Sequence, residues 1–235
     1  MIDLLAFGPH PDDLEIGMGG TIARHTSTGL RVGLCDLTAG EMGSNGTPDE
    51  RLAEAEAARV VLGAAWRMNL RWPDRKIGKD PGHLDEAVSF IRRHRPRVVA
   101  IPYWSDRHPD HVAASELLTE ASFNAGLRRY PAQGEAWKPD WICYYFINDS
   151  AAPSFVVDVS DYYEQKRLAL ECHSTQFTAP AANASVAATR LNTPLFMQLI
   201  DSRDAQFGAL AGVTRAEGFV VREPIVRSSL MKRLP

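Results

Sequence analysis

The chain has little cysteine and little net charge, and each shortage argues against a class of protein. Only three cysteines occur among 235 residues, and Cys35, Cys143 and Cys172 are far apart. This pattern argues against a disulfide framework, and because Cys35 and Cys143 stand in apolar runs we expect reduced, buried thiols in a cytoplasmic protein. The net charge of −3 gives neither a basic surface for nucleic acid nor a polybasic patch for a membrane.

Long apolar runs and nucleotide-binding fingerprints are missing as well. No run approaches the roughly 20 residues of a membrane helix, and no charged leader followed by an apolar core is visible, so we expect neither a membrane span nor a secretory signal. Gly17-Met18-Gly19-Gly20 has neither the G-x-G-x-x-G spacing nor the Lys-Ser/Thr of a P-loop. Close helix packing is the better interpretation of these glycines.

What remains is the pattern of one soluble α/β domain, with 45% apolar and 23% charged residues. Strands and helices are predicted to alternate as far as residue 126, which is typical of a parallel sheet with crossover helices. We predict a single Rossmann-like domain over residues 1–235, with a mostly parallel sheet of core order 3-2-1-4-5 and helices on both faces. The expected strands are 2–8, 32–37, 66–70, 98–101, 141–147 and 155–159, with a last extended piece at 219–226, and the expected helices are 14–28, 51–62, 84–94, 109–126, 162–173 and 195–211.

Two dense polar clusters follow the first and fourth predicted strands. The first is the stretch 10–15, HPDDLE, and the second is the stretch 106–111, DRHPDH. In a sheet of this order the first and fourth strands are neighbours at the switch point, where ligands bind outside the carboxyl ends of the strands. We therefore expect the two clusters to form one site.

The residue types in the clusters suit a divalent metal ion. His10 and Asp13 are three residues apart, and so are His108 and His111, so each pair lies on one side of a first helical turn. Imidazole and carboxylate ligands suit Zn²⁺, and a catalytic site takes three protein ligands and leaves a position for water. Four candidates for three places leave one histidine over as an acid or oxyanion donor, and the spacing does not say which one.

Asp12 points elsewhere because it is adjacent to Asp13. A carboxylate beside a metal-activated water can take up its proton, a combination that suits hydrolysis of an amide or ester carbonyl. The alternatives are that Asp12 and Asp13 only cap a helix, and that His108 and His111 lie in a solvated loop. Their joint occurrence at two strand ends favours the site.

The chain resembles the LmbE-like, or PIG-L, metal-dependent N-deacetylases over most of its length. The matching stretches are 9–17 (PHPDDLEIG), 38–47 (TAGEMGSNGT) with Arg51 and Glu54, and 108–111 (HPDH). Four further stretches are similar to the branch that contains the bacillithiol-pathway deacetylase, which acts on N-acetylglucosaminyl malate: 73–75, 106–108, 174–177 and 216–219.

The resemblance implies a role for each matching position. His10, Asp13 and His111 would bind zinc, with Fe²⁺ as the alternative metal, and Asp12 would be the general base. His108 would stabilise the oxyanion or act as an acid, with Asp110 as its orienting partner. Arg51 and Arg107 would hold the substrate, for example a malate carboxylate and sugar hydroxyls, although Arg51 could equally be a helix-surface charge paired with Glu54 or Glu56.

The resemblance also implies a zinc-dependent sugar amide deacetylase that forms a homo-oligomer, since members of the family are often homohexamers. Residues 40–47 would form a mobile flap, and Glu15, separated from the aspartates by Leu14, need not line the metal pocket. The less familiar stretch 178–194 could form a substrate wall or a subunit contact. Other functions to weigh are deacetylation of a chito-oligosaccharide or a glycolipid headgroup, nucleotide binding by a Rossmann-like domain with a structural metal, and sugar binding without catalysis.

Overall fold

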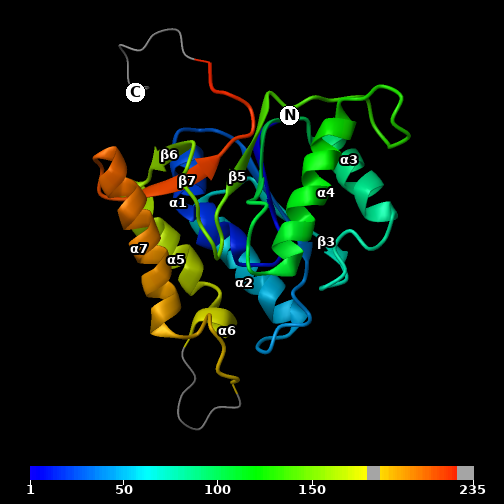
Figure 1. Ribbon diagram of the computed structural model, residues 1–235. Helices are drawn as coiled ribbons and strands as arrows, with labels where there is room; N and C mark the ends of the chain where they lie inside the picture. Colours follow the sequence, from blue (N-terminus) through cyan, green and yellow to red (C-terminus); the bar gives the residue numbers. More distant parts are fainter. Residues whose placement is uncertain (179–185, 227–235) are drawn as a thin grey trace.

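The computed structural model describes residues 1–178 and 186–226, which form an α/β fold around one seven-stranded sheet (Figure 1). The strands are β1 (Ile2–Gly8), β2 (Val32–Thr38), β3 (Trp66–Trp72), β4 (Pro96–Pro102), β5 (Trp141–Tyr145), β6 (Phe155–Asp158) and β7 (Ala216–Val220). The helices are α1 (Asp13–Ser27), α2 (Pro48–Leu62), α3 (Gly82–His94), α4 (Pro109–Ala125), α5 (Tyr163–Glu171), α6 (Ser174–Phe177) and α7 (Pro194–Ala211), with a 3₁₀ turn η1 (Ser160–Tyr162).

The strand order is β3-β2-β1-β4-β5-β7-β6, which confirms the predicted 3-2-1-4-5 core. Strands β1 to β5 pair in parallel, whereas β7 pairs antiparallel with both β5 and β6. The last strand is therefore inserted between two earlier ones, and it spans Ala216–Val220 rather than the predicted 219–226.

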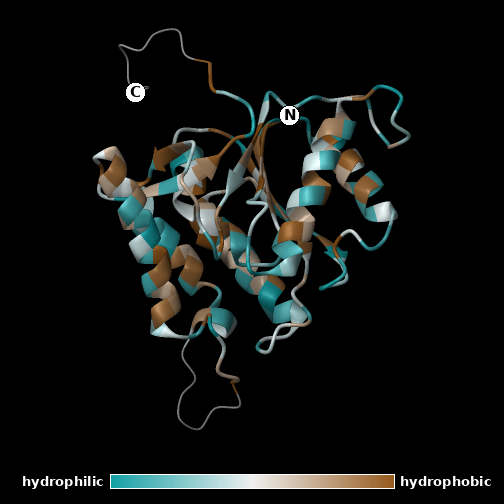
Figure 2. Ribbon diagram, viewed as in Figure 1, coloured by the Kyte–Doolittle hydropathy of each residue, from teal (hydrophilic) through white to brown (hydrophobic). Residues whose placement is uncertain are grey.

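Helices cover both faces of the sheet, as predicted. Helices α3 and α4 lie on one face, and α1, α2, α5 and α7 lie on the other (Figure 1). Alternate residues of β1 serve the two cores, because Leu4 and Ala6 belong to one apolar cluster and Leu5 and Phe7 to the other. The apolar strands lie between helices that carry both hydrophilic and hydrophobic residues (Figure 2).

The glycines of α1 allow this helix to lie against the sheet. A Cβ atom on Gly17 would come within 2.2 Å of the Tyr145 ring, and one on Gly20 within 2.8 Å of Val159. The interpretation of these glycines as packing residues is confirmed. Close packing accounts for these glycines without a phosphate-binding role. It also holds in place the helix that begins at the first polar cluster.

A fully buried Lys166 on α5 joins the helices of that face. Its ammonium donates 2.7 Å hydrogen bonds to Asp204 on α7 and to Glu217 on β7, and Glu217 also accepts the backbone N–H groups of Gly20 and Thr21 in α1. The buried charges are therefore paired and hydrogen-bonded, as burial requires.

Two further expectations concern thiols and membrane spans. Cys35 and Cys143 are buried and unpaired, as the sequence predicts. Among the described residues, none of the helices has the length and hydropathy needed to cross a bilayer.

Candidate functional site

The two polar clusters lie side by side because β1 and β4 are paired neighbours that end at the same edge of the sheet. Both strands lead into a hollow of about 370 Å³. Every residue that the sequence singles out lines this hollow except one: His10, Asp12, Asp13, Arg51, Arg107, His108 and His111 all contribute to its wall. Asp110 is buried and lies behind them.

The spacing of the candidate ligand atoms is suitable for a metal ion. Asp13 Oδ2 lies 3.1 Å from His10 Nδ1 and 3.4 Å from His111 Nε2. Ligand atoms that each lie about 2.1 Å from one tetrahedral ion are about 3.4 Å from one another. The donor set of two imidazoles and one carboxylate therefore suits Zn²⁺ or Fe²⁺ in chemistry, and the two distances from Asp13 to the histidines match such an ion.

Each of these histidines has a carboxylate on its other ring nitrogen. His10 Nε2 lies 3.3 Å from Asp74 Oδ1 and 3.4 Å from Asp110 Oδ2, and His111 Nδ1 lies 3.0 Å from Asp106 Oδ1. Metal-binding histidines commonly donate their second N–H to a carboxylate, which fixes the ring and its tautomer. This arrangement directs His10 Nδ1 and His111 Nε2 towards Asp13.

Among the described residues, two groups bring one ligand atom each within 4.8 Å of one another, namely His10 with His108 and His111, and His10 with Asp74 and Asp110. Neither group contains Asp13. The choice of His10, Asp13 and His111 as the three ligands therefore stays a prediction.

The pKa values of the cluster show how strongly its members are coupled. Burial disfavours the cationic form of His10, but the carboxylates of Asp110, Asp13 and Asp74 outweigh it and raise the pKa of His10 well above its usual value. Burial acts against the ionised form of Asp13 too, yet His111 and His10 hold the pKa of Asp13 well below its usual range. A site that stabilises positive charge this strongly is suited to a cation.

Asp12 is held in an unusual backbone conformation. Its φ of 124° is rare outside glycine, and such a conformation costs on the order of 1–3 kcal/mol. It stands at the N-cap position of α1 but makes no capping hydrogen bond with its side chain, which is buried beside Arg51, whose Nη2 lies 3.2 Å from Asp12 Oδ2. Burial raises the pKa of Asp12 to about 6 although Arg51 opposes the shift. A carboxylate with that pKa can accept a proton near neutral pH.

Arg51 does not lie on the helix surface. It is buried, and besides Asp12 it donates to the carbonyl oxygens of Gly40 and Pro11. The alternative of a surface pair with Glu54 or Glu56 is wrong, because Glu54 accepts hydrogen bonds from Ser174 and Thr175, and Glu56 pairs with Arg59. Arg51 therefore joins the general-base candidate to two loop carbonyls, and its proposed contact with substrate stays a prediction.

His108 stands at the N-terminus of α4 with its ring in the hollow. Its Nδ1 accepts a hydrogen bond from the backbone N–H of Asp110, so in the neutral ring the proton is on Nε2. Burial and the neighbouring His10 and His111 lower the pKa of His108 to about 4, which keeps the ring neutral. The Asp110 carboxylate does not orient this ring, because it accepts from Arg75 and faces His10 instead.

The loop of residues 40–47 is tied down at several points. Met42 N donates to Asp74, and Asn45 exchanges two hydrogen bonds with the backbone of Ala187. Gln176 also donates to the carbonyl of Asn45. This loop and the segment 186–193 therefore meet over the hollow, which places part of the unfamiliar stretch 178–194 in its wall; residues 179–185 lie outside the described residues.

Sequence reasoning missed several side chains that build the site. Asp74 follows β3, Asp106 is the first residue of the second cluster but was given no role, and Asn148 follows β5 and donates to Asp106. The available signal was position, since each of them lies just beyond the carboxyl end of a parallel strand. Glu15 is absent from the wall, as predicted, because it is buried in an ion pair with Arg67.

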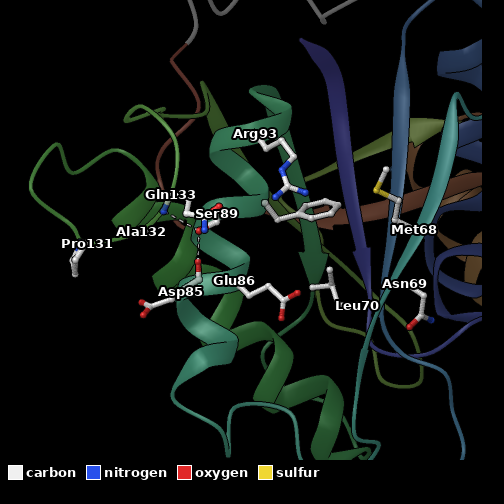
Figure 3. A pocket seen from close by; sticks show the side chains of 11 residues that line it. Met68, Asn69, Leu70, Asp85, Glu86, Ser89, Arg93, Pro131, Ala132 and Gln133 are labelled. Atoms are coloured by element: carbon white, nitrogen blue, oxygen red, sulfur yellow. Dashed lines mark hydrogen bonds between the residues drawn. The ribbon is translucent and has the colours of Figure 1, made fainter.

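A second hollow, of about 700 Å³, lies between the edge strand β3, helix α3 and residues 131–133 (Figure 3). Several of its polar groups make hydrogen bonds within the protein. Ser89 donates to the carbonyl of Asp85 and accepts from Gln133 N, and Glu86 accepts from Trp72 Nε1. None of its lining residues belongs to the groups of candidate metal ligands found among the described residues.

Comparison with known proteins agrees with this geometry. The family profile of the PIG-L, or GlcNAc-PI de-N-acetylase, proteins matches residues 5–122, which include both clusters. The diacetylchitobiose deacetylase of Thermococcus kodakarensis is 32% identical over 191 residues, which cover 74% of this chain and 70% of that protein. The 1D-myo-inositol 2-acetamido-2-deoxy-alpha-D-glucopyranoside deacetylase of Rhodococcus erythropolis is 32% identical over 199 residues, covering 70% and 68% respectively.

A solved structure extends the likeness to the whole fold. The conserved protein TT1542 from Thermus thermophilus superimposes with a TM-score of 0.89 at 39% sequence identity, with 100% of both chains covered. Fold, site and sequence thus agree, and the chain belongs to the PIG-L family of GlcNAc-PI de-N-acetylase-like proteins.

Proposed function

We propose that this protein is a zinc-dependent hydrolase that removes the acetyl group from an N-acetylglucosamine conjugate, with N-acetylglucosaminyl malate of bacillithiol biosynthesis as the substrate. The observation that carries the proposal is the meeting of two imidazoles, the Asp13 carboxylate and a buried, separately held Asp12 in one hollow. Both curated relatives described above are named as deacetylases of acetamido sugars.

A divalent ion held by His10, Asp13 and His111 would supply the Lewis acidity that activates water and polarises the acetamide carbonyl. Asp12 accepts the proton of the attacking water, since its pKa of about 6 leaves it ionised at neutral pH. Arg51 keeps that carboxylate in place through the 3.2 Å contact. After the C–N bond breaks, the same carboxyl group returns the proton to the departing amine.

His108 acts on the other atom of the acetamide, its oxygen. Because Nδ1 accepts from Asp110 N, Nε2–H is the group that donates to the negative charge developing on the carbonyl oxygen. Removal of one such donor typically slows an acyl-transfer reaction by about 10²–10³. A pKa of about 4 keeps His108 in the neutral donor form across the neutral range.

Two observations bear on the identity of the aglycone, and they favour different substrates. Arginines at the rim of the hollow, Arg75, Arg107 and Arg190, favour an anionic group such as the malate of the bacillithiol precursor. The similarity to a diacetylchitobiose deacetylase favours a neutral chito-oligosaccharide. Malate is our proposal because arginine pairs well with carboxylates, and a neutral sugar would leave Arg107 and Arg190 without a charge partner among the described residues.

Acetate release from a small panel tests the function. Metal-free protein reconstituted with Zn²⁺ or Fe²⁺ would be given N-acetylglucosaminyl malate, methyl N-acetylglucosaminide and diacetylchitobiose. We expect acetate from the panel, with the highest kcat/KM for the malate conjugate. No acetate with either metal would refute the function, and a preference for diacetylchitobiose would refute the malate assignment alone.

Substitution of the base tests the mechanism. Asp12→Asn should lower kcat by about 10²–10⁴ while metal content, measured by mass spectrometry, stays at the level of the unmodified protein. Asp161→Asn, a change in an exposed carboxylate on η1, is the control and should change neither quantity. Loss of the metal from Asp12→Asn would show that Asp12 is a ligand.

A further inference from the structure

Arg190 lies in the segment 186–193 and lines the same hollow as His108 and His111. Its guanidinium is fixed at two points. Nη1 donates a 2.8 Å hydrogen bond to Asn148 Oδ1, and the group lies 5.2 Å from the centre of the Phe196 ring. A long flexible side chain is thereby held in one position before any ligand arrives.

Asn148 links Arg190 to the metal-binding half of the site. Its side-chain amide donates to Asp106 Oδ1 at 3.0 Å and lies 3.5 Å from His111 Nδ1, while its backbone N–H donates to Asp106 Oδ2 at 2.9 Å. Arg190 is therefore separated from the histidine by a single, well-held side chain. It lies at the edge of the place where the acetamide is cleaved.

The segment that carries Arg190 is itself well anchored. Ala187 makes two hydrogen bonds to Asn45, at 2.8 and 2.9 Å, and the buried Asn192 donates to Ala187 O and accepts from Thr189 N. The position of Arg190 is thus fixed from both sides of the hollow. Preorganisation of this kind lowers the entropic cost of binding a ligand.

Arg190 differs from two other arginines of the wall in its charge partners. Arg51 is paired with Asp12 and Arg75 with Asp110. Within residues 1–178 and 186–226, by contrast, no carboxylate lies within 4.0 Å of Arg190, and its Nε and Nη2 donors make no hydrogen bond there. These two donors form the edge of a guanidinium that binds a carboxylate through two parallel hydrogen bonds.

We infer that Arg190 is a specificity-determining residue that binds a carboxylate on the aglycone of the substrate. The inference rests on the proposed function and adds a residue to it. The acetamide occupies the end of the hollow next to Asp12 and His108, and the aglycone extends past Asn148 to the Nε–Nη2 edge of Arg190. Neutral glycosides bind without this contact.

The test compares one charged and one neutral substrate in three variants. Arg190→Gln removes the charge, Arg190→Lys keeps the charge but loses the paired donors, and Arg24→Gln is the matched control. Arg24 also contacts an aromatic ring, that of Tyr162, and donates to a carbonyl oxygen, that of Asp158, but it is not in the wall of the hollow.

For Arg190→Gln we expect KM for N-acetylglucosaminyl malate to rise by about tenfold to a hundredfold, the usual range for a lost charge-assisted hydrogen bond. KM and kcat for methyl N-acetylglucosaminide should not change, Arg190→Lys should be intermediate for the malate conjugate, and Arg24→Gln should behave like the unmodified protein. Equal losses on both substrates, or no loss on either, would overturn the inference.

A binding measurement separates this inference from the proposed function. If the unmodified protein releases no acetate from any glycoside, the proposed function fails. Calorimetric titration with N-acetylglucosaminyl malate then decides the role of Arg190. A Kd at least tenfold weaker for Arg190→Gln than for the unmodified protein supports the carboxylate contact, and equal affinities, or no binding by the unmodified protein, contradict it.

Discussion

Replacement of Arg51 by methionine should damage catalysis in a way that does not depend on the aglycone. The guanidinium lies 3.2 Å from Asp12 Oδ2 and also donates to Gly40 O and Pro11 O. It is buried, and so is Asp12. The change therefore leaves a buried carboxylate without its cation, and it releases the backbone next to the strained φ of Asp12.

The size of the effect follows from the contact. Two unit charges 3.2 Å apart attract by about 5 kcal/mol at an effective dielectric constant of 20, and loss of one partner of a buried pair typically costs about 3–5 kcal/mol. If the ionised form of Asp12 loses about 3 kcal/mol of stabilisation relative to the protonated form, the pKa of its carboxyl group rises by about 2 units. Removal of a cation raises a carboxyl pKa, and the base works only when ionised, so activity is lost at low pH and returns as the pH rises.

The assay is kcat/KM for deacetylation as a function of pH. We expect the acidic limb of the Arg51→Met profile to move upward by about 2 units, with the same shift for N-acetylglucosaminyl malate and for methyl N-acetylglucosaminide. Arg51→Lys, which keeps the charge, should shift less, and thermal unfolding of each variant checks that it is folded. A rise in KM confined to the malate conjugate, with an unmoved pH profile, would refute this reasoning and support Arg51 as a substrate contact.

Three further predictions concern metal binding and stability. His111→Ala should lose the bound metal, measured by mass spectrometry of dialysed protein, and full metal occupancy would remove His111 from the ligand set. Lys166→Met should lower the free energy of unfolding in urea by about 3–5 kcal/mol, because it leaves Glu217 buried without its cation and Asp204 with Arg203 alone, and a loss below about 1 kcal/mol would contradict that account. Burial lowers the pKa of His94, so its contribution to stability is fully present above the unfolded pKa of about 6.5 and is lost as the pH falls further. His94→Phe should therefore flatten the decline of stability between about pH 6.5 and 5, and an unchanged slope would show that His94 has no part in it.

The strand order and the place of the site could be predicted because both follow from the pattern of the chain. Alternation of apolar strands and helices fixes a parallel sheet, and a parallel sheet brings the residues after β1 and β4 to one edge. The pattern therefore predicts that His10 and His111 meet, and they do. The insertion of β7 between β5 and β6 could not be predicted, because the position of a short strand in a sheet depends on pairing partners that its own residues do not specify.

The contacts of individual side chains could not be predicted from the sequence. Arg51 belongs to a helix with Glu54 three positions further on, so a surface pair was a reasonable expectation. The structure instead turns it inward to Asp12, a contact across 39 positions of the chain. The role of Asp110 differs for the same reason, since its distance from His108 in sequence says nothing of the Arg75 and His10 that its carboxylate meets.

The two hydrogen bonds between Asn45 and Ala187 have a consequence for protein engineering. They make the loop of residues 40–47 and the segment 186–193 a single exchangeable unit, although 142 positions separate the two bonded residues in the chain. A chimera that takes only the later segment from a relative would leave Asn45 facing a foreign backbone, and the new side chain at position 190 would be misplaced. Transfer of substrate preference between members of this family is therefore expected to need both pieces together.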